Sequence, residues 1–307
     1  MKIEHAPEDM TATVAAETTL AALQAELTRR GQWLPIDPSR PERLTIGAMI
    51  ANNESGPRRF GYGTIRDYLL GIRVRLADGS EIKAGGKVVK NVAGYDLCKL
   101  FVGSRGSLGT ILEATFKLRP LPEAEQFVKR NCSSLREAAE VTEKILDSPL
   151  TPIVLDLHNL ESRSNDSTIQ RFNVVLGFAG TREEVDWQLG EVSRLGISQS
   201  SNLDHDARFW AMQDSKEARK LSVLPSKVCE AIEQITGRDA HLGGQACATN
   251  SVIPFVCRAG NGIIWYRGGN DIVANDSTAD SQSRPTKLMQ RVKDAYDPKA
   301  ILPSLPK

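Results

Sequence analysis

Residues 90–97 read Lys-Asn-Val-Ala-Gly-Tyr-Asp-Leu, and residues 103–111 read Gly-Ser-Arg-Gly-Ser-Leu-Gly-Thr-Ile. Upstream, residues 45–53 read Thr-Ile-Gly-Ala-Met-Ile-Ala-Asn-Asn, and further glycines lie within 56–59 and 62–67. Glycine has no Cβ, so such clusters mark backbone that another group approaches closely. A large phosphate-bearing cofactor suits this set of segments. The sequence contains neither G-x-G-x-x-G after a strand nor G-x-x-x-x-G-K-[ST], so a Rossmann or P-loop site is not indicated.

These stretches resemble the FAD-linked oxidases of the vanillyl-alcohol-oxidase type, which carry a PCMH-type FAD-binding domain. The similarity is closest to the flavin-domain E subunits of bacterial glycolate oxidases. Residues 56–67 and 90–111 carry most of it, and weaker similarity covers about 10–122. The resemblance implies FAD as the cofactor, with the adenosine half along the loop that contains Gly106. It implies these cofactor-binding residues: Thr45, Ile46, Gly47, Ala48, Asn52, Asn53, Gly56, Gly63, Gly106, Gly109 and Ile111.

Each cluster also has a structural interpretation. Gly47 and the Asn52–Asn53 pair either grip the flavin diphosphate and ring through backbone N–H groups and side-chain amides or form a glycine turn between two strands. The loop 103–109 either follows the cofactor or packs a helix end on a sheet, and both can hold. We interpret residues 90–96 as support for the loop beneath the cofactor. Arg66-Asp67 is interpreted as an ion pair that orients the adjacent loop.

Composition restricts the function classes. The chain has 307 residues, enough for two domains, and its 25% charged residues give a net charge of +1. That charge gives no reason to expect binding to nucleic acid or to an anionic membrane surface. No apolar run reaches the roughly eighteen residues of a membrane span, and no signal peptide is recognised. We therefore expect a cytoplasmic protein, with membrane association only through partner subunits.

The five cysteines are scattered, odd in number and without a C-x-x-C pair. This pattern indicates reduced thiols rather than disulfides. It also argues against an iron–sulfur cluster held by this chain, because cluster ligation uses closely spaced thiolates.

We predict an α+β fold with three parts. These are a PCMH-type FAD-binding domain over 1–122, an α+β cap or substrate domain over 123–285, and a C-terminal segment over 286–307 that returns to the flavin domain. The resemblance implies that the family's flavin domain begins earlier than Met1, so we expect an N-terminally truncated version of it. Ala48 stands where the family usually has a second glycine.

In the first domain, the sequence predicts a strand over 11–15 and a helix that Thr18 or Thr19 caps. Asp78-Gly79 predicts a type I′ turn between strands at 72–76 and 81–83. We expect residues 111–118 to form a strand in the same sheet as 72–76. Its apolar residues alternate with polar ones and should form one buried face: Leu112, Ala114, Phe116 and Leu118.

The pattern changes after Pro122. Capping boxes at Ser134-x-x-Glu137 and Thr181-x-x-Glu184 predict helices over about 134–147 and 181–195. A loop is expected over 268–285, followed by a last helix over about 285–296. Strands are expected at 152–158, 172–178, 219–224, 251–257 and 262–267.

Oxidation of a 2-hydroxy acid on a flavin needs a base for the hydroxyl proton and a cation for the carboxylate. The histidines available as a base are His5, His158, His205 and His241. We interpret each as a packed or surface histidine, so the catalytic residues stay unassigned. The sequence shows no metal-ligand spacing and no nucleophile motif.

The resemblance implies an FAD-dependent oxidoreductase acting on CH–OH groups, as a subunit that oxidises glycolate or a related 2-hydroxy acid to the 2-oxo acid. No haem motif, nicotinamide fingerprint or cluster motif is present to pass electrons onward. We therefore expect a complex with a larger FAD-containing subunit and an iron–sulfur subunit. The alternative is a non-catalytic scaffold subunit that keeps the fold and binds FAD weakly or not at all.

Overall fold

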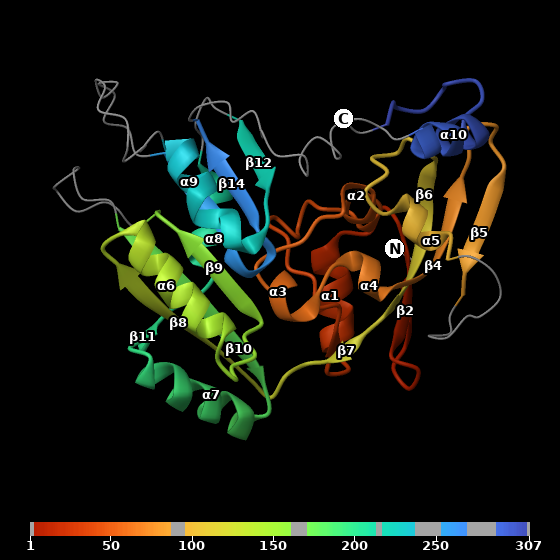
Figure 1. Ribbon diagram of the computed structural model, residues 1–307. Helices are drawn as coiled ribbons and strands as arrows, with labels where there is room; N and C mark the ends of the chain where they lie inside the picture. The colour runs from red at the N-terminus through yellow and green to blue at the C-terminus, as the bar shows by residue number, and fades with distance from the viewer. Residues whose placement is uncertain are drawn as a thin grey trace, which may run out of the picture. The chain divides into compact units, whose positions relative to one another are not determined.

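A computed structural model of the chain describes residues 3–86, 96–160, 171–212, 217–236, 253–268 and 287–305 (Figure 1). The chain divides into two compact units, Met1–Leu121 with Asp276–Lys307, and Pro122–Asn275. Each unit combines helices with an antiparallel sheet, so the predicted α+β class is confirmed. None of the described helices is long and apolar enough to cross a membrane.

The first unit contains a five-stranded sheet in the order β1-β2-β6-β4-β5. Strand β4 pairs with β6, which confirms that residues 72–76 and 111–118 share a sheet. A separate two-stranded ribbon joins β3 (Gln32–Trp33) to β7 (Arg119–Pro120). The strands of the main sheet are β1 (Ile3–Ala6), β2 (Thr11–Ala15), β4 (Leu69–Arg75), β5 (Glu81–Gly85) and β6 (Thr110–Lys117).

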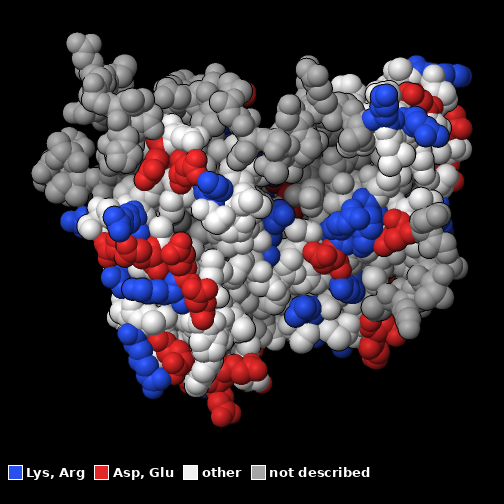
Figure 2. Space-filling view, in the orientation of Figure 1, with Lys and Arg blue, Asp and Glu red and all other residues white. Residues whose placement is uncertain are grey.

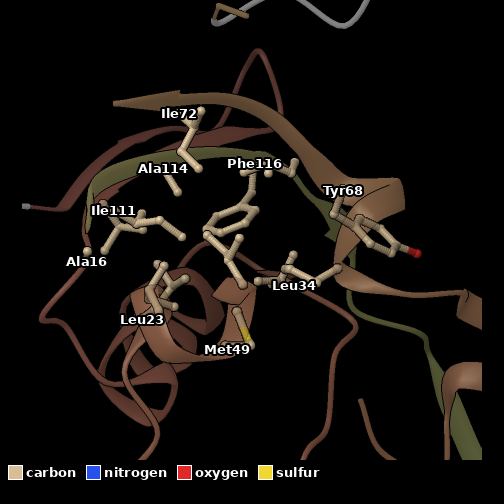
Figure 3. Packing of buried hydrophobic residues seen from close by; sticks show 14 of the residues in the cluster. Ala16, Leu23, Leu34, Met49, Tyr68, Ile72, Ile111, Ala114 and Phe116 are labelled. Carbon is tan, nitrogen blue, oxygen red and sulfur yellow. The ribbon is translucent and has the colours of Figure 1, made fainter. Parts of the chain in front are cut away.

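Helices cover one face of this sheet. Thr19 caps α1 (Leu20–Thr28) by accepting a hydrogen bond from the Ala22 N–H at 3.3 Å. In Figure 3 the helix side chains Leu23 and Met49 point toward Ala114 and Phe116 of the sheet. The other helices before β6 are α2 (Ile46–Asn52), α3 (Arg59–Tyr62), α4 (Ile65–Tyr68) and α5 (Cys98–Phe101).

Strand β6 departs from the predicted alternation at Leu112. Arg73 pairs with Glu113 and Val74 with Ile111, so Leu112 is the extra residue of a β-bulge. The bulge places Ile111 in the core and leaves Leu112 half-buried. The expectation that Leu112 lies on the buried face is therefore wrong.

The turn between β4 and β5 also differs from the prediction. A type I′ turn needs positive φ at both central residues, but within this turn only Gly79 has one, at 86°. The Leu76 N–H donates to the Ser80 carbonyl at 2.8 Å, and the Gly79 N–H donates to the Leu76 carbonyl at 3.1 Å. The turn therefore has three residues and ends in a left-handed glycine.

The second unit is built on a seven-stranded antiparallel sheet in the order β11-β8-β10-β9-β13-β14-β12. The expected strands correspond to β9 (Val154–His158), β10 (Phe172–Gly180), β12 (Ala218–Ser222), β13 (Phe255–Arg258) and β14 (Ile263–Arg267). The two strands that the sequence reading missed are β8 (Ala124–Cys132) and β11 (Gln199–Ser200).

Helices α6 (Leu135–Leu146) and α7 (Arg182–Arg194) begin at the predicted capping boxes. At α7 both hydrogen bonds of the box form between Thr181 and Glu184. At α6 the Glu137 N–H donates to the Ser134 hydroxyl, but the Glu137 carboxylate accepts from Ser133 instead. Two further helices were not predicted, α8 (Asp204–Ala211) and α9 (Val228–Thr236).

The C-terminal helix α10 (Lys287–Tyr296) packs on the core of the first unit through Val292 and Tyr296. The Tyr296 ring meets the Phe101 ring edge-on, with 5.9 Å between centroids. Two of the segments that the sequence analysis interprets lie outside the described residues. They are nearly all of the expected loop at 268–285 and the Lys90–Tyr95 part of the motif at 90–97.

Candidate cofactor site

The first predicted cofactor cluster forms a helix rather than a turn between two strands, so that structural alternative is wrong. Thr45 caps α2, and its hydroxyl accepts a hydrogen bond from the Ala48 N–H at 3.3 Å. The two preceding N–H groups also bond within the chain. The Ile46 N–H donates to the Thr18 carbonyl and the Gly47 N–H to the Ala16 carbonyl, each at 2.9 Å. These N–H groups are therefore occupied by the fold itself.

The other end of α2 meets the second predicted cluster. The Gly103 N–H donates to the Ile50 carbonyl at 3.0 Å, and the Arg105 N–H donates to the Ala51 carbonyl at 2.8 Å. Two segments more than fifty residues apart in the sequence thus lie side by side. The structure brings the end of α2, with Asn52 and Asn53, together with the loop that contains Gly106.

The predicted glycines separate into two kinds. A Cβ at Gly56 would lie 1.8 Å from the Asp37 carbonyl oxygen, one at Gly63 2.6 Å from Asp67, and one at Gly109 2.5 Å from Val74. Close packing within the chain is therefore a sufficient reason for glycine at these three positions. Gly106 differs, because its φ is +78° and, apart from its two chain neighbours, no atom of the described residues lies within 4 Å of an added Cβ. The open space at Gly106 is where a ligand could approach the backbone.

Two polar side-chain atoms at this junction have no hydrogen-bond partner among the residues that the structure describes. The Asn53 Oδ1 and Ser104 Oγ atoms are buried and unpaired. Asn53 ends α2 with a left-handed φ of 52°, and Ser104 is 7% exposed. An unsatisfied buried polar atom costs about 1–3 kcal/mol, so each needs an explanation. A polar ligand at the α2–loop junction would supply one, and the residues present fit a cofactor rich in donors and acceptors.

The remaining predicted residues differ in how far their side chains are exposed. Ile46 and Ile111 bury their side chains in the core, at 0% and 8% exposed. Thr45 and Ala48 are half-buried at the start of α2, where the cap joins them. At the far end, Asn52 is exposed.

A cavity of about 210 Å³ adjoins the same loop. Gly103, Ser104 and Leu108 line one side, and Leu288 and Val292 of α10 line another. The walls are mainly aliphatic.

Figure 2 shows Lys and Arg side chains interspersed with Asp and Glu side chains on the visible face of the first unit. Arg66 donates to the Lys99 carbonyl at 3.0 Å, whereas Asp67 accepts from the Thr64 N–H at 2.8 Å. The expected ion pair between Arg66 and Asp67 is therefore wrong, because Asp67 closes a capping box at α4.

Three of the four histidines are described. The His5 ring bonds to Gln32 at 2.9 Å in the first unit. His158 and His205 are buried in the second unit, with rings stacked at 4.7 Å. Burial and nearby positive charges lower the pKa of His158 well below its usual value of 6.5. His241 lies outside the described residues.

A buried ionic network holds α8 on the sheet of the second unit. Asp156 Oδ2 lies 2.8 Å from His205 Nε2 and 2.6 Å from Arg258 Nη1. Arg258 also pairs with Asp206 of α8. Since all four side chains are no more than 6% exposed as residues, the network has a packing role. Sequence reasoning missed it because the partners are about 50 to 100 residues apart. Among the described residues, no cluster of three or more His, Cys, Asp or Glu side chains could hold a metal.

Comparison with known proteins shows what the first unit is similar to. Residues 1–85 match the family model described as an FAD binding domain. The chain is 38% identical to glycolate oxidase subunit GlcD of Bacillus subtilis over 154 residues, which cover 50% of this chain and 33% of GlcD. It is also 38% identical to subunit GlcE of Escherichia coli over 142 residues, which cover 46% of this chain and 41% of GlcE. These matches confirm the resemblance to FAD-linked oxidases and support FAD as the cofactor of this domain type.

Further relatives extend the picture. The chain is 41% identical to D-lactate dehydrogenase of Archaeoglobus fulgidus over 119 residues, covering 39% of this chain and 27% of the relative. The matched stretches span less than half of each of these relatives. A solved structure of alkyldihydroxyacetonephosphate synthase superposes with a TM-score of 0.68 at 17% identity, over 96% of this chain and 63% of the synthase. This likeness confirms the predicted PCMH-type fold.

Proposed function

We propose that the chain binds FAD at the junction of α2 with the loop at 103–111 and serves in the oxidation of a 2-hydroxy acid. The observation that carries the proposal is the junction itself. Gly106 leaves space there, and the Asn53 and Ser104 side chains present unpaired polar atoms. The match of residues 1–85 to the FAD binding domain family supports the choice of cofactor.

Each group at the junction has a role in this proposal. Asn53 and Ser104 hydrogen-bond polar atoms of the cofactor, and Gly106 allows close approach of its backbone. When bound, FAD supplies the electron acceptor for the oxidation.

The two units divide the work. We assign residues 1–122 with the C-terminal segment 286–307 to the cofactor, and 123–285 to substrate binding. Gly56, Gly63 and Gly109 hold the chain in the shape that the cofactor segments need. A base for the substrate hydroxyl stays unassigned, because His158 and His205 are buried within the second unit.

The names of the relatives guide the choice of substrate and partners. Glycolate and D-lactate, the substrates in those names, are both 2-hydroxy acids. Two relatives are named as subunits of glycolate oxidase. We therefore propose glycolate or a close analogue as the substrate, and a larger FAD-containing subunit and an iron–sulfur subunit as partners.

Anaerobic reduction tests this proposal. The chain is purified alone and with candidate partner subunits, loaded with FAD and mixed with glycolate, D-lactate or, as a control, acetate. We expect the flavin absorption to bleach with a 2-hydroxy acid, faster when the chain is mixed with its partners than in the partners alone, and to persist with acetate. If the loaded protein keeps its oxidised spectrum with both hydroxy acids and all partners, oxidation is excluded and the scaffold alternative is supported.

A further inference from the structure

A buried charge joins the C-terminal helix α10 to the loop at 103–109. The Lys293 ammonium donates to the Ser107 carbonyl at 2.7 Å, to Asp297 Oδ2 at 2.5 Å and to the Leu302 carbonyl at 3.3 Å. Lys293 is 7% exposed and Asp297 is 3% exposed. A buried charge is unfavourable unless it is paired and hydrogen-bonded. Here three acceptors match the three donors of the ammonium group.

The acid of this pair is itself fixed in place. Asp297 accepts hydrogen bonds from the Ile301 N–H at 2.8 Å and the Leu302 N–H at 2.9 Å. Burial raises the pKa of Asp297, but the hydrogen bonds from Lys293 and these N–H groups outweigh burial and leave that pKa below its usual value. The carboxylate is therefore ionised at neutral pH, and the chain after α10 is closed around it.

On the loop side, Lys293 reaches a tightly bonded turn. Ser107 is fully buried, and its hydroxyl and its N–H both donate to the Ser104 carbonyl, at 2.6 and 2.9 Å. The start of the same loop bonds to Ile50 and Ala51 at the end of α2. The loop is thus held by α2 at one point and by α10 at another.

We propose that Lys293 is a positioning residue for the cofactor, acting through the Ser107 carbonyl. By fixing the turn 104–107, it sets where the Ser104 hydroxyl and the open backbone at Gly106 lie. The C-terminal segment thereby controls cofactor affinity, although it lies almost two hundred positions further along the chain. This inference rests on the proposed binding of FAD at this loop.

Lys293→Met tests the inference, because it removes the ammonium group and keeps most of the aliphatic chain. Lys287→Met is the matched control, since Lys287 is exposed on the same helix. Lys293→Arg retains the charge and should keep part of the FAD affinity that Lys293→Met loses. The measurements are the dissociation constant for FAD and the rate of amide hydrogen exchange in peptides that cover residues 103–111.

We expect Lys293→Met to weaken FAD binding by about tenfold, as loss of a charge-assisted hydrogen bond would. Its loop amides should exchange faster without FAD, whereas Lys287→Met should behave as the wild type in both measurements. Equal FAD affinity in Lys293→Met and the wild type would overturn the inference and leave the proposed function intact. No FAD binding by the wild type would instead contradict the proposed function. If the loop amides of Lys293→Met then also exchanged at the wild-type rate, Lys293 would not fix the turn 104–107.

Discussion

At the scale of single residues, the glycines show how packing within the chain and ligand binding place similar demands on a sequence. Gly47 belongs to a predicted cofactor cluster, yet its N–H donates to Ala16, and an added Cβ would lie 3.1 Å from the Ala16 Cβ. Gly106 has a left-handed backbone and open space around it. Both occur in glycine clusters of the sequence, and only the three-dimensional contacts tell them apart.

Gly47→Ala should therefore lower stability through overpacking against Ala16. We expect the free energy of unfolding to fall by about 1 kcal/mol, because an overpacking cost of about 1–3 kcal/mol exceeds the gain of about 1 kcal/mol from replacing a helical glycine by alanine. Ala16→Gly should remove part of this loss in the double mutant, because neighbouring substitutions are not additive. Urea unfolding of the four proteins measures the coupling. Additive losses would mean that the Ala16 contact is not the reason for glycine at position 47.

At the scale of secondary structure, most elements could be predicted because their signals are local. The capping residues Thr19 and Thr181 start their helices as expected. Helix α9 was missed although its buried residues follow helical spacing, so a signal was available: Val228, Ala231, Ile232 and Ile235. The bulge at Leu112 could not be predicted, because it depends on the register between two distant strands.

The candidate site was predictable only in the parts that have local sequence signals. The glycine and asparagine segments could be read from the sequence, and the resemblance put them in one site. That α2 would form a helix, and that its first N–H groups would bond to Thr18 and Ala16, depends on tertiary contacts. The unpaired atoms of Asn53 and Ser104 likewise appear only when the two segments meet.

Helix α8 leads to a prediction about pH. His158 is stacked on His205 of α8, and its pKa is lowered by burial first and then by electrostatic interaction with His205, Arg208 and Lys129. The unfolded chain takes up a proton near pH 6.5, whereas the folded protein does so only at much lower pH. The second unit should therefore lose stability as pH falls below 6.5, and its stability should be independent of this group above about pH 7.5.

The measurement is the pH dependence of urea unfolding between about pH 5 and 7.5. His158→Asn keeps an acceptor for the Leu160 N–H, which donates to His158 Nδ1 at 3.2 Å, and it cannot titrate. We expect a flatter profile in His158→Asn than in the wild type. His5→Asn in the first unit serves as the control and should keep the wild-type slope. An equally steep loss of stability in His158→Asn would assign the pH dependence to other groups.

At the scale of the whole molecule, segments from both ends of the sequence meet at one loop. Residues 45–53 supply α2, residues 103–111 supply the loop, and α10 adds Lys293. The resemblance gave the fold class and the cofactor, and the match of residues 1–85 and the relatives agree with both. Substrate and partners are not set by these contacts, because they depend on chemistry that this loop does not contain.

The most direct test of the central claim is a titration of FAD with the purified chain, followed by flavin fluorescence and equilibrium dialysis. Gly106→Asn is the informative variant, because asparagine tolerates the left-handed backbone and fills the open space at this position. The account predicts one FAD per wild-type chain, and a Gly106→Asn protein that unfolds at the wild-type urea concentration but binds FAD at least about tenfold more weakly. Equal FAD affinity in the two proteins, or no FAD binding by a folded wild-type chain, would contradict the claim that the α2–loop junction is the cofactor site.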